Sequence, residues 1–273
     1  MFPVADLLFD SGKKHDLAII VSDNDDFISK VMGAVSTERT IVLTSRKKDI
    51  NVREEVIYYT FNKNLGNSIY FMDFIEKLIF RIFLGGYIKG DMDILLLSDY
   101  PFRFILEFNS SAMPFYRVME ELSDVVDKEV MEALLKVIFE IHLEGREGKH
   151  IGTLFIVGDT DRVLEMSKQL VINPYNNQEE NVRSILKKEN WESIKELAQI
   201  DGAFVLDPKG NVLCAGRYIL VDPQVQTTGG LGGRHLAAAS ITYTTNSVSF
   251  ALSSSGTVRI FRKGKVVLKE DLN

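Results

Sequence analysis

Short, continuous apolar runs alternate with helical patterns in the first part of this chain, and this alternation restricts the fold more than any other feature. The runs are 17–22 (LAIIVS), 40–44 (TIVLT), 56–60 (VIYYT) and 94–98 (ILLLS). Helical spacing is found at 26–35 and at 68–84. A strand without polar alternation is expected where both faces of a sheet are covered. The first part is therefore predicted to be a parallel or mixed sheet covered by helices.

The second part of the chain changes from helical patterns to strand patterns. Apolar residues at helical spacing run from Met113 to Leu143, which predicts one long or two short connecting helices. Further helices are expected at 160–168, at 178–200 with an interruption near Asn190, and at 234–243. Strands are predicted at 153–157, 203–206, 212–220, 247–253, 257–262 and 266–269. We expect two domains, residues 1–115 and 125–273.

Charge and cysteine content exclude several classes of protein. The net charge is −6 with the two signs mixed along the chain, so binding of nucleic acid is disfavoured. Cys214 is the only cysteine, which excludes an intrachain disulfide and a cysteine-based zinc site. The most apolar helical stretch, 71–88, contains four charged residues, so no membrane span is expected. The first ten residues lack a basic leader, and a soluble cytoplasmic protein is predicted.

A glycine-rich segment, 229–233, directly precedes the helix predicted at 234–243. Glycine lets a backbone approach a ligand closely, and the free amides at the start of a helix favour an anion. Arg234 and His235 in the first turn would add a charge-assisted hydrogen bond and a titratable ring. The segment indicates either a phosphate site or a flexible loop that leads into a helix packed through its alanines.

Two further segments carry side chains suited to the same chemistry. The sequence 201–203 (DGA) lies between a predicted helix and a predicted strand, where a carboxylate can hold a divalent cation or orient a hydroxyl. The alternative there is an ordinary turn with a capping glycine. The sequence 253–256 (SSSG) offers hydroxyls between two predicted strands, and by itself it indicates only a hairpin turn.

Together and in this order, four segments of the chain resemble the diadenylate cyclase family in its archaeal, two-domain form. They are 145–148 (GREG), 152–159 (GTLFIVGD), 196–207 (ELAQIDGAFVLD) and 232–235 (GGRH). The resemblance runs from about Leu134 to Lys269 and implies a C-terminal diadenylate cyclase fold, a mixed α/β structure whose sheet is surrounded by helices. The N-terminal domain is expected to be an open α/β sandwich similar to the C-terminal domain of pyruvate kinase, an analogy that carries no activity.

The resemblance implies that two ATP molecules condense into cyclic di-AMP with release of two pyrophosphates. In the family two active sites face each other, and the 3′-hydroxyl of each ATP attacks the α-phosphate of the other. A homo-oligomer is therefore expected. A divalent cation, Mn²⁺ or Mg²⁺, is implied because hard cations suit phosphate and carboxylate oxygens.

The correspondence of motifs also assigns roles to individual residues. Asp201 and His235 would hold the metal, and both would be catalytic together with Arg234. The residues expected to bind ATP are Gly202, Ala203, Gly232, Gly233, Arg234, Ser253, Ser254 and Ser255.

The sequence departs from the familiar bacterial pattern at two positions. Leu236 stands where a second arginine commonly follows the histidine, and Gly233 stands where a threonine often precedes the arginine. Two other functions stay open. One is a catalytically weak ATP-binding regulatory protein, and the other is an interaction module that acts through the N-terminal domain.

Overall fold

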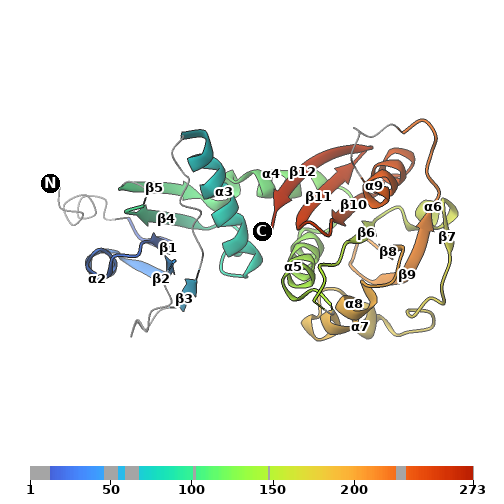
Figure 1. The fold of residues 1–273 in the computed structure, drawn as a ribbon, viewed down its shortest axis with the longest axis horizontal. Coiled ribbons are helices and arrows are strands. Elements are labelled where there is room, and N and C mark those ends of the chain that lie inside the picture. Colours follow the sequence, from blue (N-terminus) through green and yellow to red (C-terminus); the bar gives the residue numbers. More distant parts are fainter. Residues whose placement is uncertain are drawn as a thin grey trace. The chain divides into compact units, whose positions relative to one another are not determined.

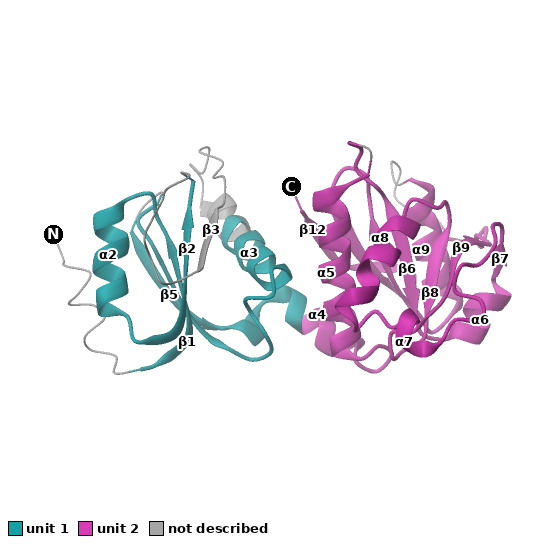
Figure 2. Cartoon of the chain, turned by 90° about the horizontal axis from the view of Figure 1, so that it is seen from below, with its two compact units in different colours: residues 1–116 teal, residues 117–273 magenta. Residues whose placement is uncertain are grey.

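The computed structural model describes residues 13–45, 55–58, 68–100, 103–146, 148–225 and 232–272. The chain divides into two compact units, residues 1–116 and 117–273 (Figures 1 and 2). The division falls inside helix α4 (Pro114–Leu122), which follows the short 3-10 helix η1 (Ser110–Ala112). Of the glycine-rich segment, only Gly232 and Gly233 lie within the described residues.

Unit 1 is built on a five-stranded sheet with the order β3-β2-β1-β4-β5. The strands are β1 (His15–Val21), β2 (Thr37–Thr44), β3 (Glu55–Tyr58), β4 (Asp93–Ser98) and β5 (Phe104–Asn109). The first four are parallel, and β5 runs antiparallel beside β4. Helices α2 (Asp25–Ala34) and α3 (Ser68–Leu84) lie on opposite faces of this sheet (Figure 2). Residues 17–21 of the central strand are consequently fully buried.

The four strands predicted for unit 1 are confirmed, although Tyr59 and Thr60 at the end of one of them lie outside the described residues. The edge strand β5 is not predicted from the sequence. Its side chains alternate between half-buried and exposed, so it lacks the continuous apolar run of the covered strands.

Unit 2 contains a seven-stranded sheet with the order β12-β11-β10-β6-β8-β9-β7. The strands are β6 (Thr153–Val157), β7 (Ser167–Gln169), β8 (Ala203–Leu206), β9 (Val212–Ile219), β10 (Val248–Leu252), β11 (Thr257–Arg262) and β12 (Lys265–Asp271). Strands β6 and β8 are parallel, and the other neighbours are antiparallel. The expected mixed sheet is confirmed.

Helices lie on both faces of this second sheet (Figure 1). They are α5 (Lys128–Glu144), α6 (Thr160–Glu165), α7 (Glu180–Arg183), η2 (Lys188–Asn190), α8 (Trp191–Leu197) and α9 (Gly233–Thr244). Helix α9 packs on one face through Ala238 and Ala239, which share a buried cluster with Leu154 of β6. On the opposite face the rings of Phe155 and Phe204 stack with their centroids 4.7 Å apart.

Two predicted helices of unit 2 differ from the structure. The helix expected at 160–168 ends at Glu165, and the following residues form the edge strand β7. The interruption expected near Asn190 in the helix at 178–200 is confirmed, because α8 begins at Trp191. The part before it is not one helix but α7 and η2, because the backbone amide of Ile185 donates to the carbonyl of Gly210 instead of continuing a helix. The connecting segment at 113–143 forms two helices, α4 and α5.

None of the helices among the described residues combines the length and the apolar character that a bilayer span requires.

Candidate active site

The predicted site residues gather at one end of the sheet in unit 2. There Asp201 and Gly202 precede β8, Gly152 precedes β6, and α9 begins at Gly233. Because β6 and β8 are parallel and β10 runs the other way, the starts of β6 and β8 lie at the end of β10. Three segments that are distant in the sequence therefore meet: residues 201–203, the first turn of α9 and the turn between β10 and β11.

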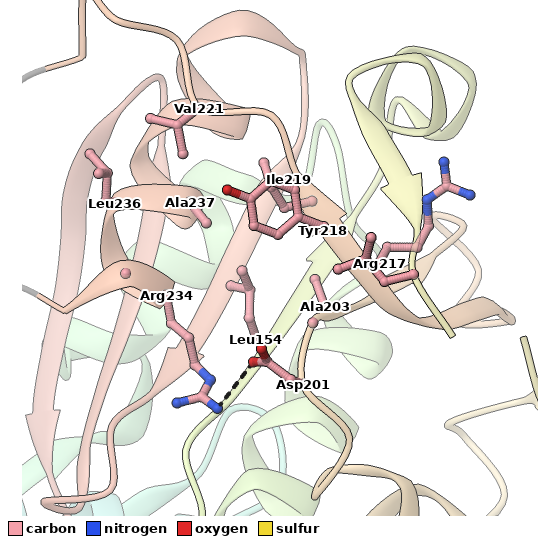
Figure 3. A pocket seen from close by; sticks show the side chains of 13 residues that line it. Leu154, Asp201, Ala203, Arg217, Tyr218, Ile219, Val221, Arg234, Leu236 and Ala237 are labelled. Carbon is pink, nitrogen blue, oxygen red and sulfur yellow. Dashed lines mark ion pairs between the residues drawn. The ribbon is translucent and has the colours of Figure 1, made fainter. Parts of the chain in front are cut away.

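Asp201 and Arg234 face each other at this end of the sheet (Figure 3). Nη2 of Arg234 lies 3.7 Å from Oδ1 of Asp201, and the two side chains are 46% and 97% exposed. An ion pair this open to water contributes little to stability. Both charged groups are therefore available to a ligand.

Gly202 fixes the position of Asp201 through backbone contact. It has a φ of +113°, and a Cβ at this residue would lie 2.6 Å from the carbonyl carbon of Gly216 and 2.7 Å from the amide nitrogen of Arg217. Gly216 has a φ of +72° and lies where the register between β8 and β9 shifts, as in a β-bulge. A side chain at Gly202 would push the two strands apart, whereas a Cβ on Gly216 would clash with Cγ2 of Val171.

The guanidinium of Arg234 packs closely against Gly152. A Cβ on Gly152 would lie 3.1 Å from Nη1 of Arg234, 3.0 Å from the carbonyl oxygen of Leu252 and 3.3 Å from the amide nitrogen of Ser254. The guanidinium therefore lies between the carboxylate of Asp201 and the turn that follows β10. The sequence motif 152–159 contains this glycine, and its small size is what admits the arginine.

A cavity of about 390 Å³ opens beside the ion pair. Asp201, Gly202, Ala203, Gly233 and Arg234 line it among the predicted residues. Its apolar lining comes from Leu154, Leu170, Ile219, Val221, Leu236 and Ala237. Figure 3 shows the charged pair at one end of the cavity and Val221 and Leu236 toward the other. Such a division suits a ligand with an anionic end and a flat apolar end.

Besides Ile219, two residues of β9 with polar groups line the cavity, and neither is predicted from the sequence. The side chain of Tyr218 is 53% exposed and lies over the apolar part (Figure 3). The guanidinium of Arg217 is turned away, because it donates to the hydroxyl of Ser167 at 2.8 Å and to the carbonyl of Leu164 at 2.8 Å. Arg217 therefore secures the edge strand β7, and Tyr218 is the polar ring that a ligand would meet.

His235 belongs to the same helix turn but does not line the cavity. It is 6% exposed, and its Nε2 lies 2.9 Å from Nη1 of Arg259 on β11. Burial lowers the pKa of the imidazole, and the nearby charges of Arg259 and Arg234 lower it further. The ring is therefore neutral at neutral pH.

The three predicted serines form the hairpin turn between β10 and β11. The hydroxyl of Ser253 accepts from the amide of Thr257 at 3.0 Å and lies 2.8 Å from the hydroxyl of Ser255. None of the three lines the cavity, and neither does Gly232. Ser254 approaches the site through its amide, next to Arg234.

The two predicted metal ligands differ in how well they fit a cation. Asp201 offers an exposed carboxylate, which suits Mg²⁺ or Mn²⁺. Nε2 of His235 faces a guanidinium, so this atom is not free to bind a cation in the observed arrangement. Among the described residues, no group of three histidine, cysteine or acidic side chains is placed to hold a metal ion. A cation here would need ligands from the substrate as well.

Comparisons with known proteins cover both units. A family model described as DisA bacterial checkpoint controller nucleotide-binding matches residues 140–266, a range that includes the predicted site residues. The diadenylate cyclase of Methanocaldococcus jannaschii is 31% identical over 284 residues, which cover 96% of this chain and 89% of that protein. The diadenylate cyclase of Haloferax volcanii is 35% identical over 147 residues, covering 53% of this chain and 54% of that protein.

Among solved structures, a double mutant of DacA from Staphylococcus aureus is 15% identical, with a TM-score of 0.36, over 53% of this chain and 87% of that one. A similarity at this level adds nothing to the assignment, which rests on the sequence relatives. The match to the Methanocaldococcus protein spans nearly all of both chains. The chain therefore belongs to the diadenylate cyclase family of enzymes.

Proposed function

We propose that this protein condenses two molecules of ATP into cyclic di-AMP and releases two pyrophosphates. The observation that carries the proposal is the pairing of Asp201 with Arg234, at 3.7 Å, beside a cavity whose other end is apolar. A carboxylate and a guanidinium at one end suit the ribose hydroxyl and the triphosphate of a nucleotide. The apolar end suits a purine ring.

Each of the two condensation steps forms one phosphodiester bond. The 3′-oxygen of one ATP bonds to the α-phosphorus of the facing ATP, the bond from that phosphorus to the bridging oxygen breaks, and pyrophosphate leaves. Asp201 orients the attacking hydroxyl and accepts its proton, while Arg234 neutralises charge on the triphosphate. Holding the two reactants in line supplies much of the acceleration, because phosphoryl-group chemistry depends mainly on positioning and electrostatics.

The glycines and serines support the same nucleotide. Gly202 and Ala203 shape the wall next to the carboxylate, and the amides of Gly232 and Gly233 at the start of α9 face the phosphates. The hydroxyls of Ser253–Ser255, on the turn beside Arg234, bind the terminal phosphates.

We propose that a divalent cation binds Asp201 and the phosphate oxygens of ATP. Mg²⁺ and Mn²⁺ are commonly held by one or two carboxylates together with substrate phosphates, and the exposed Asp201 meets this requirement. The cation would neutralise charge on the triphosphate and on the leaving pyrophosphate. Nε2 of His235 faces Arg259, so we expect His235 to contact the substrate through its other ring nitrogen and not to bind the cation through Nε2.

The reaction needs a second copy of the chain. One cavity of about 390 Å³ suits one nucleotide, and ring closure requires two nucleotides aligned head to tail. We therefore propose a homo-oligomer in which two cavities face each other. For unit 1 we propose an open α/β sandwich similar to the C-terminal domain of pyruvate kinase. This rests on its mixed five-stranded sheet with helices on both faces.

The test is to incubate the protein with ATP and Mn²⁺ or Mg²⁺ and to measure cyclic di-AMP by mass spectrometry. We expect product from the wild type and at least a 100-fold lower rate, on the order of the loss of one acid–base group, from Asp201→Asn. Glu165→Gln is the matched control, because Glu165 forms an exposed ion pair with Arg162 at 2.7 Å away from the cavity.

Neither substitution should change the free energy of unfolding by more than about 0.5 kcal/mol. If the wild type binds ATP tightly but yields no cyclic di-AMP, the protein is a nucleotide-binding regulator and the proposal is wrong. Product formation by Asp201→Asn at the wild-type rate would remove Asp201 from the mechanism.

A further inference from the structure

The contact between His235 and Arg259 joins the first turn of α9 to the middle of β11. Nη1 of Arg259 lies 2.9 Å from Nε2 of His235, whose ring is nearly buried. Arg259 is held in register by Ala251 of β10 on one side and Lys269 of β12 on the other. The guanidinium is therefore presented to the ring from a strand in the interior of the sheet, and a loop movement would not displace it.

The chemistry of the two side chains decides which atom carries the proton. A guanidinium has hydrogen-bond donors and no acceptor, and it stays protonated in proteins. Nε2 of His235 must therefore be the acceptor, without a proton of its own. A neutral imidazole then carries its proton on Nδ1.

The surroundings of Arg259 indicate that it is more than a structural cation. Within the part of the chain that the structure describes, no carboxylate pairs with Arg259, and its recorded partner is His235. The half-buried guanidinium adds a second positive charge near Arg234 at the start of α9. Arg234 is paired with Asp201, so Arg259 is the cation of the two that has no carboxylate beside it among the described residues. A partly buried cation without a counter-charge is costly unless an anion binds nearby.

The second guanidinium beside His235 comes from strand β11, because α9 has no arginine after His235. The residue after His235 is Leu236, whose side chain lies at the apolar part of the cavity (Figure 3). The helix turn therefore supplies Arg234 and no second arginine. Arg259 brings a guanidinium to the same histidine from β11.

We infer that Arg259 is a positioning residue, whose guanidinium holds His235 as the neutral tautomer protonated on Nδ1 and so leaves that N–H as the hydrogen-bond donor of the ring. The inference rests on the proposed function. It makes His235 a hydrogen-bond donor, which suits a phosphate oxygen. A metal ion would need a ring lone pair, and the lone pair on Nε2 is taken by Arg259.

The tautomer can be read directly by ¹⁵N NMR of the full-length protein labelled at histidine, at a pH above 7. The chain has four histidines, and the His235→Gln variant identifies the signals of His235. We expect the wild type to show Nδ1 protonated and Nε2 unprotonated. Arg259→Met should shift the ring toward the Nε2-protonated form that a free imidazole prefers, whereas Arg259→Lys, which keeps a donor, should retain the wild-type form.

Kinetics of cyclic di-AMP formation provide the second measurement. Arg259→Met should lower kcat about tenfold or more with a smaller change in KM for ATP, and Arg259→Lys should restore part of kcat. Lys269→Met is the control, because it removes an exposed positive charge from the residue directly opposite on β12. It should change neither the tautomer nor kcat.

Protonation of Nε2 in the wild type would overturn the inference, as would an unchanged tautomer or kcat in Arg259→Met. If Arg259→Met does not fold, the wild-type spectrum and Arg259→Lys decide the matter alone. The NMR measurement needs no product. A wild type that makes no cyclic di-AMP would therefore refute the proposed function, while the tautomer would still report on Arg259.

Discussion

Gly202 imposes the strictest steric requirement at the site. Its φ of +113° lies in a region that residues with a Cβ avoid, and the backbone of Gly216 and Arg217 leaves no room for a methyl group. Gly233 differs, because a Cβ there would meet no atom within 4 Å. The two glycines differ in their surroundings: Gly202 permits a close backbone contact, and Gly233 borders open space.

Gly202→Ala is therefore expected to lower the free energy of unfolding by about 3 kcal/mol or more, through backbone strain and the opening of β8 from β9. Gly233→Ala should change it by less than about 1 kcal/mol, because alanine is favourable in a helix. Thermal unfolding followed by circular dichroism measures both. Equal melting temperatures for Gly202→Ala and the wild type would show that the strands can separate at little cost.

At the residue scale, the sequence indicated those residues of the candidate site that belong to recognisable motifs. It indicated Asp201 and Arg234, which the fold brings to 3.7 Å. It did not indicate Tyr218, because the bulge at Gly216 decides which residues of β9 face the cavity. Arg259 was also missed, since its partner His235 lies on another element and the contact depends on how α9 packs over β11.

At the scale of elements, Lys195 joins two helices of unit 2. Its side chain is 3% exposed, and its Nζ contacts Glu140 and Glu144 of α5 as well as Glu192 of α8. Burial alone would lower the pKa of the lysine, but the hydrogen bonds to these carboxylates outweigh burial and raise it. The hydrogen bond from Lys195 in turn holds the pKa of Glu144 below its usual range.

Lys195→Met should therefore lower the free energy of unfolding by about 2 kcal/mol at pH 7, because three carboxylates lose their shared donor. A carboxylate whose folded pKa is lowered stabilises the protein above its unfolded pKa and loses that contribution as the pH falls through the folded value. The difference between variant and wild type should shrink below about pH 4.5, the ordinary pKa of glutamate.

Urea denaturation at several pH values measures this difference. Lys128→Met serves as the control, because Lys128 forms an exposed ion pair with Glu120 and its loss should cost less than about 0.5 kcal/mol. If the difference in free energy of unfolding between Lys195→Met and the wild type stays constant down to pH 3, the three carboxylates are not the cause of the destabilisation.

Secondary structure was predicted correctly where burial sets the pattern of apolar residues. It was predicted wrongly where hydrogen bonds to distant parts of the chain determine the local structure. The covered strands of both sheets follow from their apolar runs. The three polar residues of β7 carry no strand signal, and they pair with β9 because Arg217 binds Ser167. The region 178–200 has a helical composition, yet the indole of Trp191 donates to the carbonyl of Ile185 and holds the chain in a compact turn.

On the scale of the whole molecule, the proposed reaction depends on two subunits, and a mixing experiment tests this dependence. Wild type and Asp201→Asn are mixed at constant total concentration until subunits exchange, and cyclic di-AMP is measured. If two facing sites close the ring, the yield should fall as the square of the wild-type fraction, and a linear dinucleotide should accumulate. A yield proportional to the wild-type fraction would show that one subunit completes the ring.

The glycine-to-glycine contact between Gly202 and Gly216 also limits how this enzyme can be redesigned. Because the two backbones lie in direct contact, the backbone itself sets the position of Asp201 beside the cavity. Exchanging neighbouring side chains would therefore not move Asp201. To fit a larger base, substitutions should therefore be made at Val221 and Leu236, at the end of the cavity away from Asp201 and Arg234. A smaller side chain there enlarges the cavity and leaves those two charged groups in place.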